Sequence, residues 1–490
     1  MALSRKPQEI VEDSKNPLLG KHESWGRVQV GEIAEILNGY AFKSSKFTND
    51  KGTPLIRIRD VGKDSSNTFY DGGYDETYLV NDGDLLVGMD GDFRCSIWKG
   101  GKALLNQRVC KISLKTEEYD FRFLSYVLQP YLDAIHAETS AVTVKHLSSR
   151  SISDIPLPLP PKEQQKRIVA KIEELFSHID AGIEALKKAK QLLKQYRQSV
   201  LKAAVTGELT KEWREANKDK LEPASQLLEH INAERVQEPG RKLEEWEQEL
   251  AQWKSAGEKG KKPAKPKKTK ELESMLEAEL NSLGDLPDGW LWERLGNLTV
   301  DVFDGPFGSN LKSSDYVEEG IRVIRLENIG NLEFKDNKQS FVKPEKYEQL
   351  KKHTVGCGDL IFSSFVADGT RVVVLPKHIE KAINKADCFC VRCYGGSVYN
   401  KYLALFLATN SAYKRLENEV HGATRPRINT TQLKNIEIPI CSIEEQNEAV
   451  RILELKSDAI TRLEGEIDEK LLMVDKNKQS VLATAFSGQL

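Results

Sequence analysis

Basic and amide side chains gather in polar, glycine-rich segments that the local patterns predict to be loops or strand ends. Arginine and asparagine can form paired hydrogen bonds with the edges of guanine and adenine, whereas lysine mainly neutralises phosphate. These residue types therefore predict contacts with double-stranded DNA. The candidates are Arg57, Arg59, Arg108, Lys145 and Arg150 in the first half of the chain, and Asn310, Lys312, Arg325, Arg371, Arg425, Arg427 and Asn429 in the second half.

The charge of the whole chain excludes a simple polycation. Lysine and arginine number 72 against 74 aspartate and glutamate residues, which gives a formal net charge of −2. Any basic surface must therefore be local. An ordinary surface ion pair is the simpler interpretation of any single arginine, and Arg371, Arg425 and Arg427 are the strongest candidates for a DNA contact.

Motifs that carry catalytic chemistry are absent from the sequence. It has no GxxxxGK[ST] phosphate loop, HExxH zinc helix, GxSxG elbow, GxGxxG turn or Asn/Asp-Pro-Pro-aromatic motif. The triplet 333–335 has the Glu-x-Lys spacing of some nucleases, which is common by chance. Cys388, Cys390 and Cys393 lack a second ligand pair and favour a buried strand over a zinc site. We therefore expect that this chain alone catalyses nothing and binds no metal or cofactor.

The elements that must position the candidates occur twice in the chain. Residues 163–209 align with 444–490 without a gap, ending in QSVLKAAVTGEL and QSVLATAFSGQL respectively. Upstream, WGRVQVGEI resembles WLWERLGNL, GTPLIRIRDVG resembles GIRVIRLENIG, and GDLL resembles GDLI. The order is thus domain, helix, insert, domain, helix.

The repeated 163–209 and 444–490 segments each predict a long helix with an apolar residue every seven positions. This period keeps one stripe facing a partner helix over many turns. We expect the two helices to pair as an antiparallel coiled coil, with a pseudo-twofold axis near Leu186 and Ile467; two separate amphipathic helices are the alternative. The expected seam consists of Ile172, Ile179, Leu186, Leu193 and Val200 with Leu453, Ile460, Ile467, Val474 and Val481.

Short alternating β-rich blocks, each followed by a helix from about Phe121 or Tyr399, predict two similar small mixed domains. The fold class is therefore α+β. In the insert, helices are expected from Pro223 and again from Leu243, and the seven lysines between Lys259 and Lys270 suggest a flexible linker more than a nucleic-acid contact. The expected organisation is an N-terminal tail (1–21), a first globular domain (22–160), a first long helix (161–209), a helical and lysine-rich insert (210–285), a second globular domain (286–441) and a second long helix (442–490).

Length and composition agree with a cytoplasmic protein of several domains. At roughly 100 to 200 residues per domain, 490 residues predict about two to four domains. The seven cysteines indicate buried thiols in a reducing compartment, not a disulfide framework. No apolar run is long enough to cross a membrane, and the first residues lack the apolar core of a secretory signal.

A duplicated domain in which each copy precedes a long helix ending in QSVL...A..[TS]G.L resembles the specificity subunit of type I restriction-modification systems. GDLLVGMDGDF with ALLNQRVCKI, GPFGSNLKSSDY, LEPASQLLEHINAER and the IPLPPKEQQKRIV-like entry to the first helix are also similar to that family. The resemblance covers nearly the whole chain. The lysine-rich part of the insert departs from it and has no assigned role.

The resemblance implies a division of labour. This chain would read double-stranded DNA, each globular domain contacting one half of a bipartite asymmetric site through the major groove. The paired helices would fix the unread spacer and bind two methylation subunits. Those subunits would use S-adenosylmethionine to modify adenine N6, and restriction subunits would use ATP and magnesium to translocate and cleave.

Two other functions fit parts of the sequence. A noncatalytic adaptor could bind protein partners through both domains, with the coiled coil as a spacer. One half of a fused methylase-nuclease is disfavoured by the missing cofactor motifs. Sequence-dependent DNA binding would support the DNA-reading subunit over the adaptor. Turnover by the isolated chain would support the fused methylase-nuclease.

Overall fold

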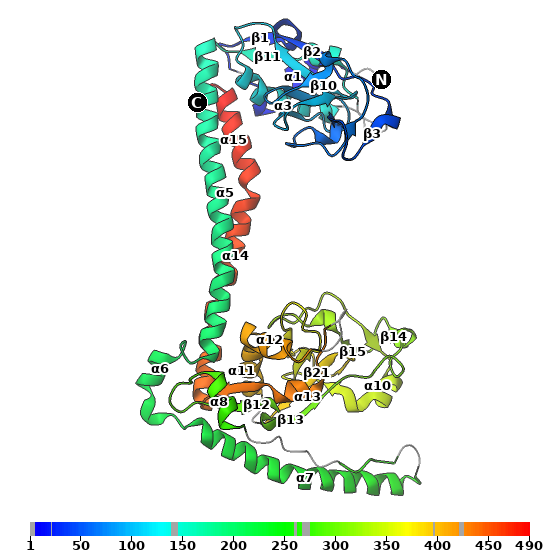
Figure 1. Ribbon diagram of the computed structural model, residues 1–490, viewed down its shortest axis with the longest axis vertical. Helices are drawn as coiled ribbons and strands as arrows, with labels where there is room; N and C mark the ends of the chain where they lie inside the picture. Colours follow the sequence, from blue (N-terminus) through cyan, green and yellow to red (C-terminus); the bar gives the residue numbers. More distant parts are fainter. Residues whose placement is uncertain are drawn as a thin grey trace. The chain divides into compact units, whose positions relative to one another are not determined.

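A computed structural model describes most of the chain, which divides into two compact units (Figure 1). The first unit combines Met1–Ala189 with Glu466–Leu490, and the second unit is Lys190–Gly465. Each unit therefore holds one globular domain together with parts of both long helices. The described residues are 5–20, 22–138, 146–258, 262–266, 275–394, 397–420 and 426–490.

The described residues of the first unit form three small sheets. In spatial order they are β1 (Gly26–Gln29) with β11 (Pro156–Leu159); β2 (Ala34–Asn38), β10 (Val109–Leu114), β7 (Leu85–Gly88) and β8 (Cys95–Ile97); and β3 (Phe47–Thr48), β5 (Phe69–Tyr70), β4 (Thr53–Ile56), β9 (Ala103–Leu105) and β6 (Leu79–Val80). Its helices within and before the globular domain are α1 (Pro7–Asp13), α2 (Val30–Ile33), α3 (Phe121–Glu138) and α4 (Ser149–Ser153), with 3₁₀ turns η1 (Pro17–Leu19), η2 (Ser44–Lys46), η3 (Ile58–Asp60) and η4 (Glu76–Tyr78).

The second unit repeats this set of sheets. They are β12 (Leu291–Arg294) with β22 (Glu437–Ile440); β13 (Thr299–Phe303), β21 (Cys388–Cys393), β18 (Leu360–Ser363) and β19 (Val372–Val374); and β14 (Tyr316–Val317), β16 (Phe341–Val342), β15 (Ile321–Ile324), β20 (Ala382–Asn384) and β17 (Thr354–Val355). Its shorter helices are α6 (Lys211–Ala216), α8 (Glu277–Leu283), α9 (Leu295–Leu298), α10 (Pro344–Leu350), α11 (Ser397–Leu407), α12 (Asn410–Glu417) and α13 (Thr430–Asn435), with η5 (Lys218–Lys220), η6 (Ser313–Asp315), η7 (Leu326–Asn328) and η8 (Lys351–His353).

The two globular domains have the same strand order throughout, which confirms the duplication and the α+β class. The only parallel pair among the described strands of each five-stranded sheet is β4 with β9 in one domain and β15 with β20 in the other. The two-stranded sheets pair in the same register, Gly26 opposite Leu159 and Leu291 opposite Ile440. The aligned sequence blocks therefore occupy equivalent strands.

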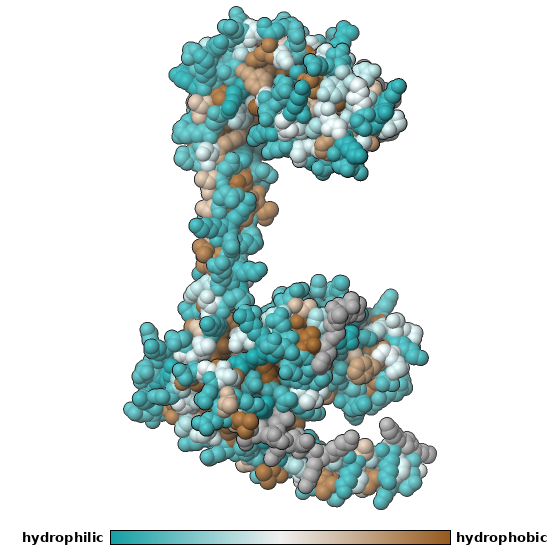
Figure 2. All heavy atoms as spheres, in the orientation of Figure 1, coloured by the Kyte–Doolittle hydropathy of each residue, from teal (hydrophilic) through white to brown (hydrophobic). Residues whose placement is uncertain are grey.

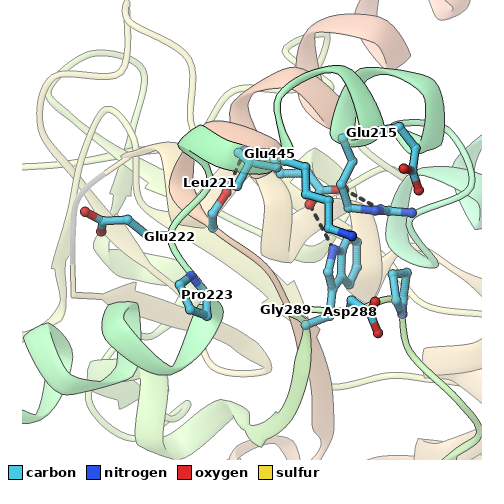
Figure 3. Close-up of a pocket in the computed structure, with 12 residues that line it drawn as sticks. Glu215, Leu221, Glu222, Pro223, Asp288, Gly289 and Glu445 are labelled. Atoms are coloured by element: carbon cyan, nitrogen blue, oxygen red, sulfur yellow. Dashed lines mark hydrogen bonds and ion pairs between the residues drawn. The ribbon is translucent and has the colours of Figure 1, made fainter.

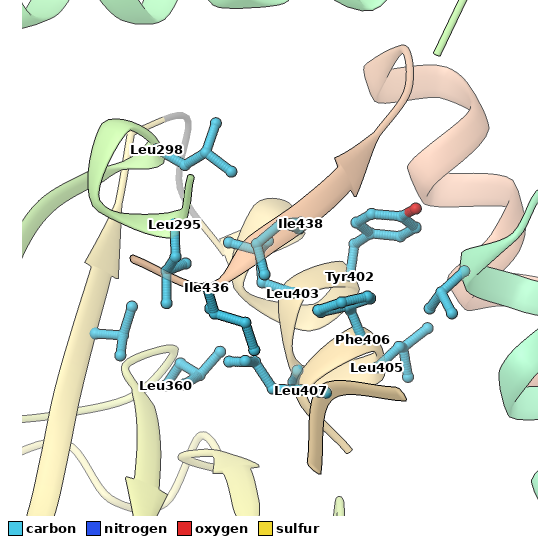
Figure 4. Packing of buried hydrophobic residues seen from close by; sticks show 14 of the residues in the cluster. Leu295, Leu298, Leu360, Tyr402, Leu403, Leu405, Phe406, Leu407, Ile436 and Ile438 are labelled. Carbon is cyan, nitrogen blue, oxygen red and sulfur yellow. The ribbon is translucent and has the colours of Figure 1, made fainter. Parts of the chain in front are cut away.

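A large apolar cluster packs α11 against the sheets of the second globular domain (Figure 4). Tyr402 and Phe406 of α11 lie in it with Leu360 of β18 and Ile438 of β22, all at most 1% exposed. Truncating a buried side chain of this size typically costs about 3–5 kcal/mol of stability. The equivalent helix α3 begins at Phe121, as expected, whereas α11 begins at Ser397, two residues before the expected start.

Strand β21 confirms the prediction that the CFCVRC run is a buried strand. Cys388 and Cys390 are fully buried, and burial raises the pKa of the Cys388 thiol above its usual range. No cluster of metal-binding side chains occurs among the described residues. The expectation that all seven cysteines are buried is wrong for Cys357, which is exposed.

The long helices pair within each unit. The first is α5 (Lys162–Val205), and the second comprises α14 (Ile443–Leu472) and α15 (Val474–Phe486), separated only by Met473. In the first unit, the early α5 residues Ile168 and Ile172 share a cluster with Phe486 near the end of α15. Two turns further along α5, Asp180 binds Lys478 at 2.7 Å. Increasing residue numbers on one helix thus meet decreasing numbers on the other.

The second unit shows the same antiparallel direction. Near the end of α5, Leu201 and Val205 share a cluster with Ala449 and Val450 near the start of α14. One turn earlier on α5, Arg197 binds Ser457 Oγ at 2.8 Å and Glu464 Oε2 at 3.0 Å. Antiparallel pairing is therefore confirmed in both units (Figure 1).

The residues of the expected seam differ in burial. Ile172, Val200, Ile460 and Ile467 are buried, and the other six seam residues are half-buried. Apolar residues off this seam are exposed, including Leu192 at 54% and Leu455 at 58%. Gly207 and Gly488 end the helices with φ of 76° and 75°, the left-handed conformation that glycine adopts readily.

Two details differ from the expectations. The segment expected to be a tail packs on the first unit, because Ile10 and Leu19 are buried and Arg27 donates to Leu19 O at 3.0 Å. One continuous helix, α7 (Ala224–Ser255), spans the stretch of the insert where two separate helices were expected. Pro239 lies inside it, and the single lost backbone hydrogen bond is tolerated on this exposed stretch.

Most of the lysine-rich segment lies outside the described residues. In the described part, Trp246 Nε1 donates to Pro263 O at 3.1 Å, and Lys265 Nζ lies 5.7 Å from the Trp246 ring centroid. The 262–266 segment therefore contacts α7. In the part of the chain that the structure covers, no helix is both long and apolar enough to cross a membrane.

Candidate nucleic-acid interface

A tryptophan at the start of each globular domain donates a hydrogen bond to the long helix that follows that domain. In the first unit, Trp25 Nε1 donates to Gln164 Oε1 at 3.2 Å. In the second unit, Trp290 Nε1 donates to Glu445 Oε2 at 2.9 Å. Gln164 and Glu445 are aligned in the repeat, so the same contact fixes each domain on its long helix.

The second junction adds a buried ion pair (Figure 3). Glu445 is only 2% exposed, and its Oε1 accepts hydrogen bonds from Arg214 Nη1 at 2.6 Å and from Thr210 Oγ1 at 2.7 Å. A cavity of about 380 Å³ lies beside it, between Trp290 and the Leu221–Pro223 segment. Glu445 therefore connects α14, α6 and the start of the second globular domain.

Arg57 and Arg325 occupy equivalent positions at the end of β4 and β15. The backbone N of Arg57 donates to Asp60 Oδ2 at 3.0 Å, and that of Arg325 donates to Asn328 Oδ1 at 2.9 Å. The Arg325 guanidinium also donates to Ser340 Oγ at 3.2 Å. The structure thus fixes the backbone at these candidates and leaves both side chains partly exposed.

Arg59, Arg108 and Arg150 lie on the surface of the first globular domain. Arg59 is exposed and donates to Thr68 Oγ1 at 3.1 Å. Arg108 pairs with Asp90, its Nε 3.5 Å from Asp90 Oδ2. Arg150 is exposed on α4. Lys145 lies outside the described residues.

Asn310, Lys312 and Arg371 belong to two regions of the second globular domain. Asn310 and Lys312 are exposed in the glycine loop between β13 and η6. Arg371 is half-buried and donates to Ser363 Oγ at 3.2 Å and Leu326 O at 3.4 Å. These contacts give Arg371 a role in holding η7 against β18, which limits its reach outward.

Arg427 and Asn429 precede α13. Arg427 lies with its Cζ 4.5 Å from the Phe365 ring centroid and its Nη1 3.5 Å from Asp387 Oδ1. Asn429 is the N-cap of α13, where its Oδ1 accepts from Gln432 N at 2.9 Å. Arg425 lies outside the described residues. A base contact by Asn429 would therefore compete with a helix cap.

One basic residue that the sequence did not single out is Arg94. It directly precedes β8, as Arg371 precedes β19, and it is exposed. Arg94 lines a surface hollow of about 370 Å³ with Arg59 and Asp90. The sequences DGDFR and DGTR, which end in Arg94 and Arg371, are similar and could have pointed to Arg94. The similarity is hard to see because the loop before β19 is two residues longer than the loop before β8.

The carboxyl of Asp304, at the start of the glycine loop, titrates abnormally. Burial raises its pKa from 3.8 to about 6, and the nearby Asp387 charge adds to the shift. Because the folded chain holds this proton more tightly than the unfolded chain, the ionised form costs stability above about pH 6, and the cost disappears below about pH 4. Asp304 therefore destabilises the folded chain at neutral pH.

Replacing Asp304 with Asn should remove this penalty. We expect the Asp304→Asn variant to unfold at a higher temperature than the parent at pH 7–8 and at nearly the same temperature at pH 4, because Asn resembles the protonated acid. Thermal unfolding across this pH range measures the difference. An Asn variant less stable than the parent at pH 8 would contradict the assignment.

Comparison with known proteins identifies the family. The family described as "Type I restriction modification DNA specificity domain" matches residues 22–193 and 312–473, one match for each domain with most of its helix. The EcoBI specificity subunit of Escherichia coli, from a type I restriction enzyme, is 34% identical over 492 residues, covering 100% of this chain and 91% of that protein. The StySPI specificity subunit of Salmonella potsdam is 30% identical over 499 residues, covering 96% and 89%.

Solved structures share the fold. The HsdS subunit from Thermoanaerobacter tengcongensis superposes with a TM-score of 0.54 at 18% identity, covering 96% of this chain and 98% of that chain. A chain from a structure of the type I R-M system, covering 96% of this chain and 99% of its own length, has a TM-score of 0.57 at 17% identity. The family model over both halves of the chain and the relative that is 34% identical over the whole length of this chain show that the chain belongs to the type I restriction-modification DNA specificity family.

Proposed function

We propose that this chain is the DNA-reading subunit of a type I restriction-modification complex. The observation that carries the proposal is the duplication: two globular domains with the same strand order, each joined to antiparallel long helices by the same tryptophan contact. A repeated frame with different loops suits two readers of different half-sites. Each domain would read one half of a bipartite target, and the helices would set the spacer.

Methylation and restriction subunits supply the chemistry in this proposal. The chain itself contributes recognition, while its partners bring S-adenosylmethionine, ATP and magnesium. With partners sharing the phosphate contacts, a net charge of −2 is compatible with DNA binding.

DNA binding by the purified complex tests the proposal. The chain is combined with its methylation subunits, and affinities for DNA of many sequences are measured at one salt concentration. We expect tight binding to DNA carrying one two-part sequence and much weaker binding to the rest, typically by 10³-fold or more. Equal affinity for every sequence would contradict the proposal and favour an adaptor.

The long helices also offer a surface for the methylation subunits. Leu192 and Tyr196 are spaced one turn apart on α5 and are 54% and 47% exposed, although both are large and apolar. Apolar residues reach the surface along the paired helices (Figure 2). Such residues are enriched where proteins bind partners.

Removing this apolar pair should weaken assembly without unfolding the chain. We expect the double variant Leu192→Ser, Tyr196→Ser to bind methylation subunits at least tenfold more weakly, while its unfolding free energy changes by about 0.5 kcal/mol or less per exposed site. Titration calorimetry measures the affinity. Lys194→Ser, an exposed polar site on the same helix, is the control, and equal loss in both variants would refute the docking surface.

A further inference from the structure

The same two backbone hydrogen bonds join three segments at one corner of each globular domain. In the first domain, Met89 N donates to Arg108 O at 2.8 Å, and Leu147 N donates to Met89 O at 2.7 Å. In the second domain, Ser364 N donates to Asp387 O at 2.9 Å, and Ile428 N donates to Ser364 O at 3.0 Å. We call each set of segments the reading corner: the loop after β7 or β18, the turn before β10 or β21, and the strand-like segment before α4 or α13.

The first reading corner carries an arginine on its turn and a carboxylate on its loop. Arg108 Nε lies 3.5 Å from Asp90 Oδ2. His146, on the third segment, has its Nδ1 2.6 Å from Asp90 Oδ1 and 3.2 Å from Arg108 Nη1. Arg108 Nη1 is itself a donor, so His146 Nδ1–H cannot donate to it. The carboxylate of Asp90 is the acceptor for His146 Nδ1–H. Asp90 is thus held by His146 and faces Arg108.

The second reading corner carries the carboxylate on its turn and the arginine on its third segment. Arg427 Nη1 lies 3.5 Å from Asp387 Oδ1, and its guanidinium covers the Phe365 ring at 4.5 Å. Ser364 Oγ donates to Asp387 Oδ1 at 3.0 Å. Asp387 is thus held by a serine and faces Arg427.

The two corners therefore keep the backbone hydrogen bonds and an ion pair, but the turn residue is the arginine in one pair and the carboxylate in the other, and its partner comes from the loop in the first corner and from the third segment in the second. Arg108 and Asp387 are equivalent in the frame, as are His146 and Arg427. Each arginine keeps much of its guanidinium in solvent, since Arg108 is 53% and Arg427 is 43% exposed, while the carboxylates Asp90 and Asp387 are 20% and 23% exposed. The carboxylates can orient the arginines without covering them.

Backbone conformation also marks this corner. Arg108 has φ of 74° and Asp387 has φ of 70°, in the left-handed region that side chains other than glycine disfavour. Aspartate tolerates that region better than arginine does. Both domains have this turn, and an arginine in the disfavoured conformation is expected where its side chain has a function.

We propose that the reading corner reads one base pair in each half of the target, through Arg108 in one half and Arg427 in the other. The proposal rests on the proposed function and deepens it. Arginine pairs with O6 and N7 of guanine, so the base pair read is G·C in each case. Asp90 and Asp387 are positioning residues that aim the guanidinium groups, and His146 holds Asp90.

Binding of single-base variants of the target by the complex with methylation subunits tests the proposal. For Arg108→Ala, we expect discrimination at one G·C position of one half to fall roughly 10- to 100-fold, with the other half read as before. Arg427→Ala should do the reverse. Arg108→Lys should lose the same discrimination although its charge is kept, because lysine lacks the paired donors.

The positioning role has its own readout. Asp90→Asn should relax the same base position as Arg108→Ala, to a smaller extent, with the salt dependence of binding unchanged because no phosphate contact is lost. Arg122→Ala is the matched control, since Arg122 is an exposed arginine paired with Glu173 of α5. It should leave discrimination at every position intact.

Two results would overturn the proposal while leaving the proposed function in place. Uniform weakening of Arg108→Ala on every sequence, with a shallower salt dependence, would make Arg108 a phosphate contact. Unchanged binding by Arg108→Ala and Arg427→Ala would make both ion pairs purely structural. Equal binding of all sequences by the unmodified complex is different, because it would remove the proposed function itself.

Discussion

Replacing Ile460 with Asp is expected to separate the paired helices of the second unit. Ile460 is 2% exposed in the seam, and one turn along α14 Glu464 already carries a negative charge in its pair with Arg197. An isolated buried carboxylate costs several kcal/mol, and the group takes up a proton or forces the helices apart instead. We therefore expect loss of hydrogen-exchange protection throughout 450–465.

The matched control places the same substitution on the exposed face of α14. Leu455 is 58% exposed, so Leu455→Asp should change the unfolding free energy by only about 0.5 kcal/mol and keep the amides protected. Hydrogen exchange of both variants, compared with the parent, measures the difference. Equal protection in Ile460→Asp and the parent would mean that the seam does not hold the helices together.

The second large effect is expected at the buried junction of the second globular domain. Glu445→Ala removes the acceptor shared by Thr210, Arg214 and Trp290, and it leaves the 15%-exposed Arg214 side chain without its counter-charge. Breaking a buried pair in this way typically costs about 3–5 kcal/mol. The second unit should unfold at clearly lower temperature, and the domain should lose its fixed attachment to α14.

The first unit supplies the comparison for this experiment. Its equivalent residue is Gln164, which accepts from Trp25 with a neutral amide oxygen. Glu445→Gln should therefore be milder than Glu445→Ala, because its amide oxygen can still accept either from Arg214 and Thr210 or from Trp290, although both variants remove the counter-charge of Arg214. Thermal unfolding of the two variants checks this order, and an equally large loss in both would show that charge, not hydrogen bonding, dominates the junction.

Features with a sequence period were predictable. The gap-free repeat placed both long helices, and the seven-residue spacing selected the buried seam, because burial on a paired helix follows that period directly. The antiparallel direction agrees with the expectation, but only contacts such as that between Asp180 and Lys478 fix it. The sequence did not predict that α7 is one continuous helix, because Pro239 and Gly240 indicate a break. An exposed helix can nevertheless contain both residues.

The candidate site was less accessible to sequence reasoning. The arginines were found by residue type, but the reading corner depends on backbone hydrogen bonds that join Met89, Arg108 and Leu147 across the fold. Asp90 had no signal of its own, because a carboxylate that orients an arginine can come from any segment that the fold brings near. Arg371 and Asn429 turned out to have contacts that hold the backbone.

The most direct measurement of the central claim is a map of methylated adenines in cells that carry the complex, before and after residues 22–160 are replaced by the equivalent domain of a relative with another target. The replacement must keep Arg27 and Tyr131 or their equivalents, because they bind the segment before the domain. We expect a two-part motif of which only one half changes while the spacer stays the same. A change in both halves, or no change in either, would contradict the account of two independent readers held by paired helices.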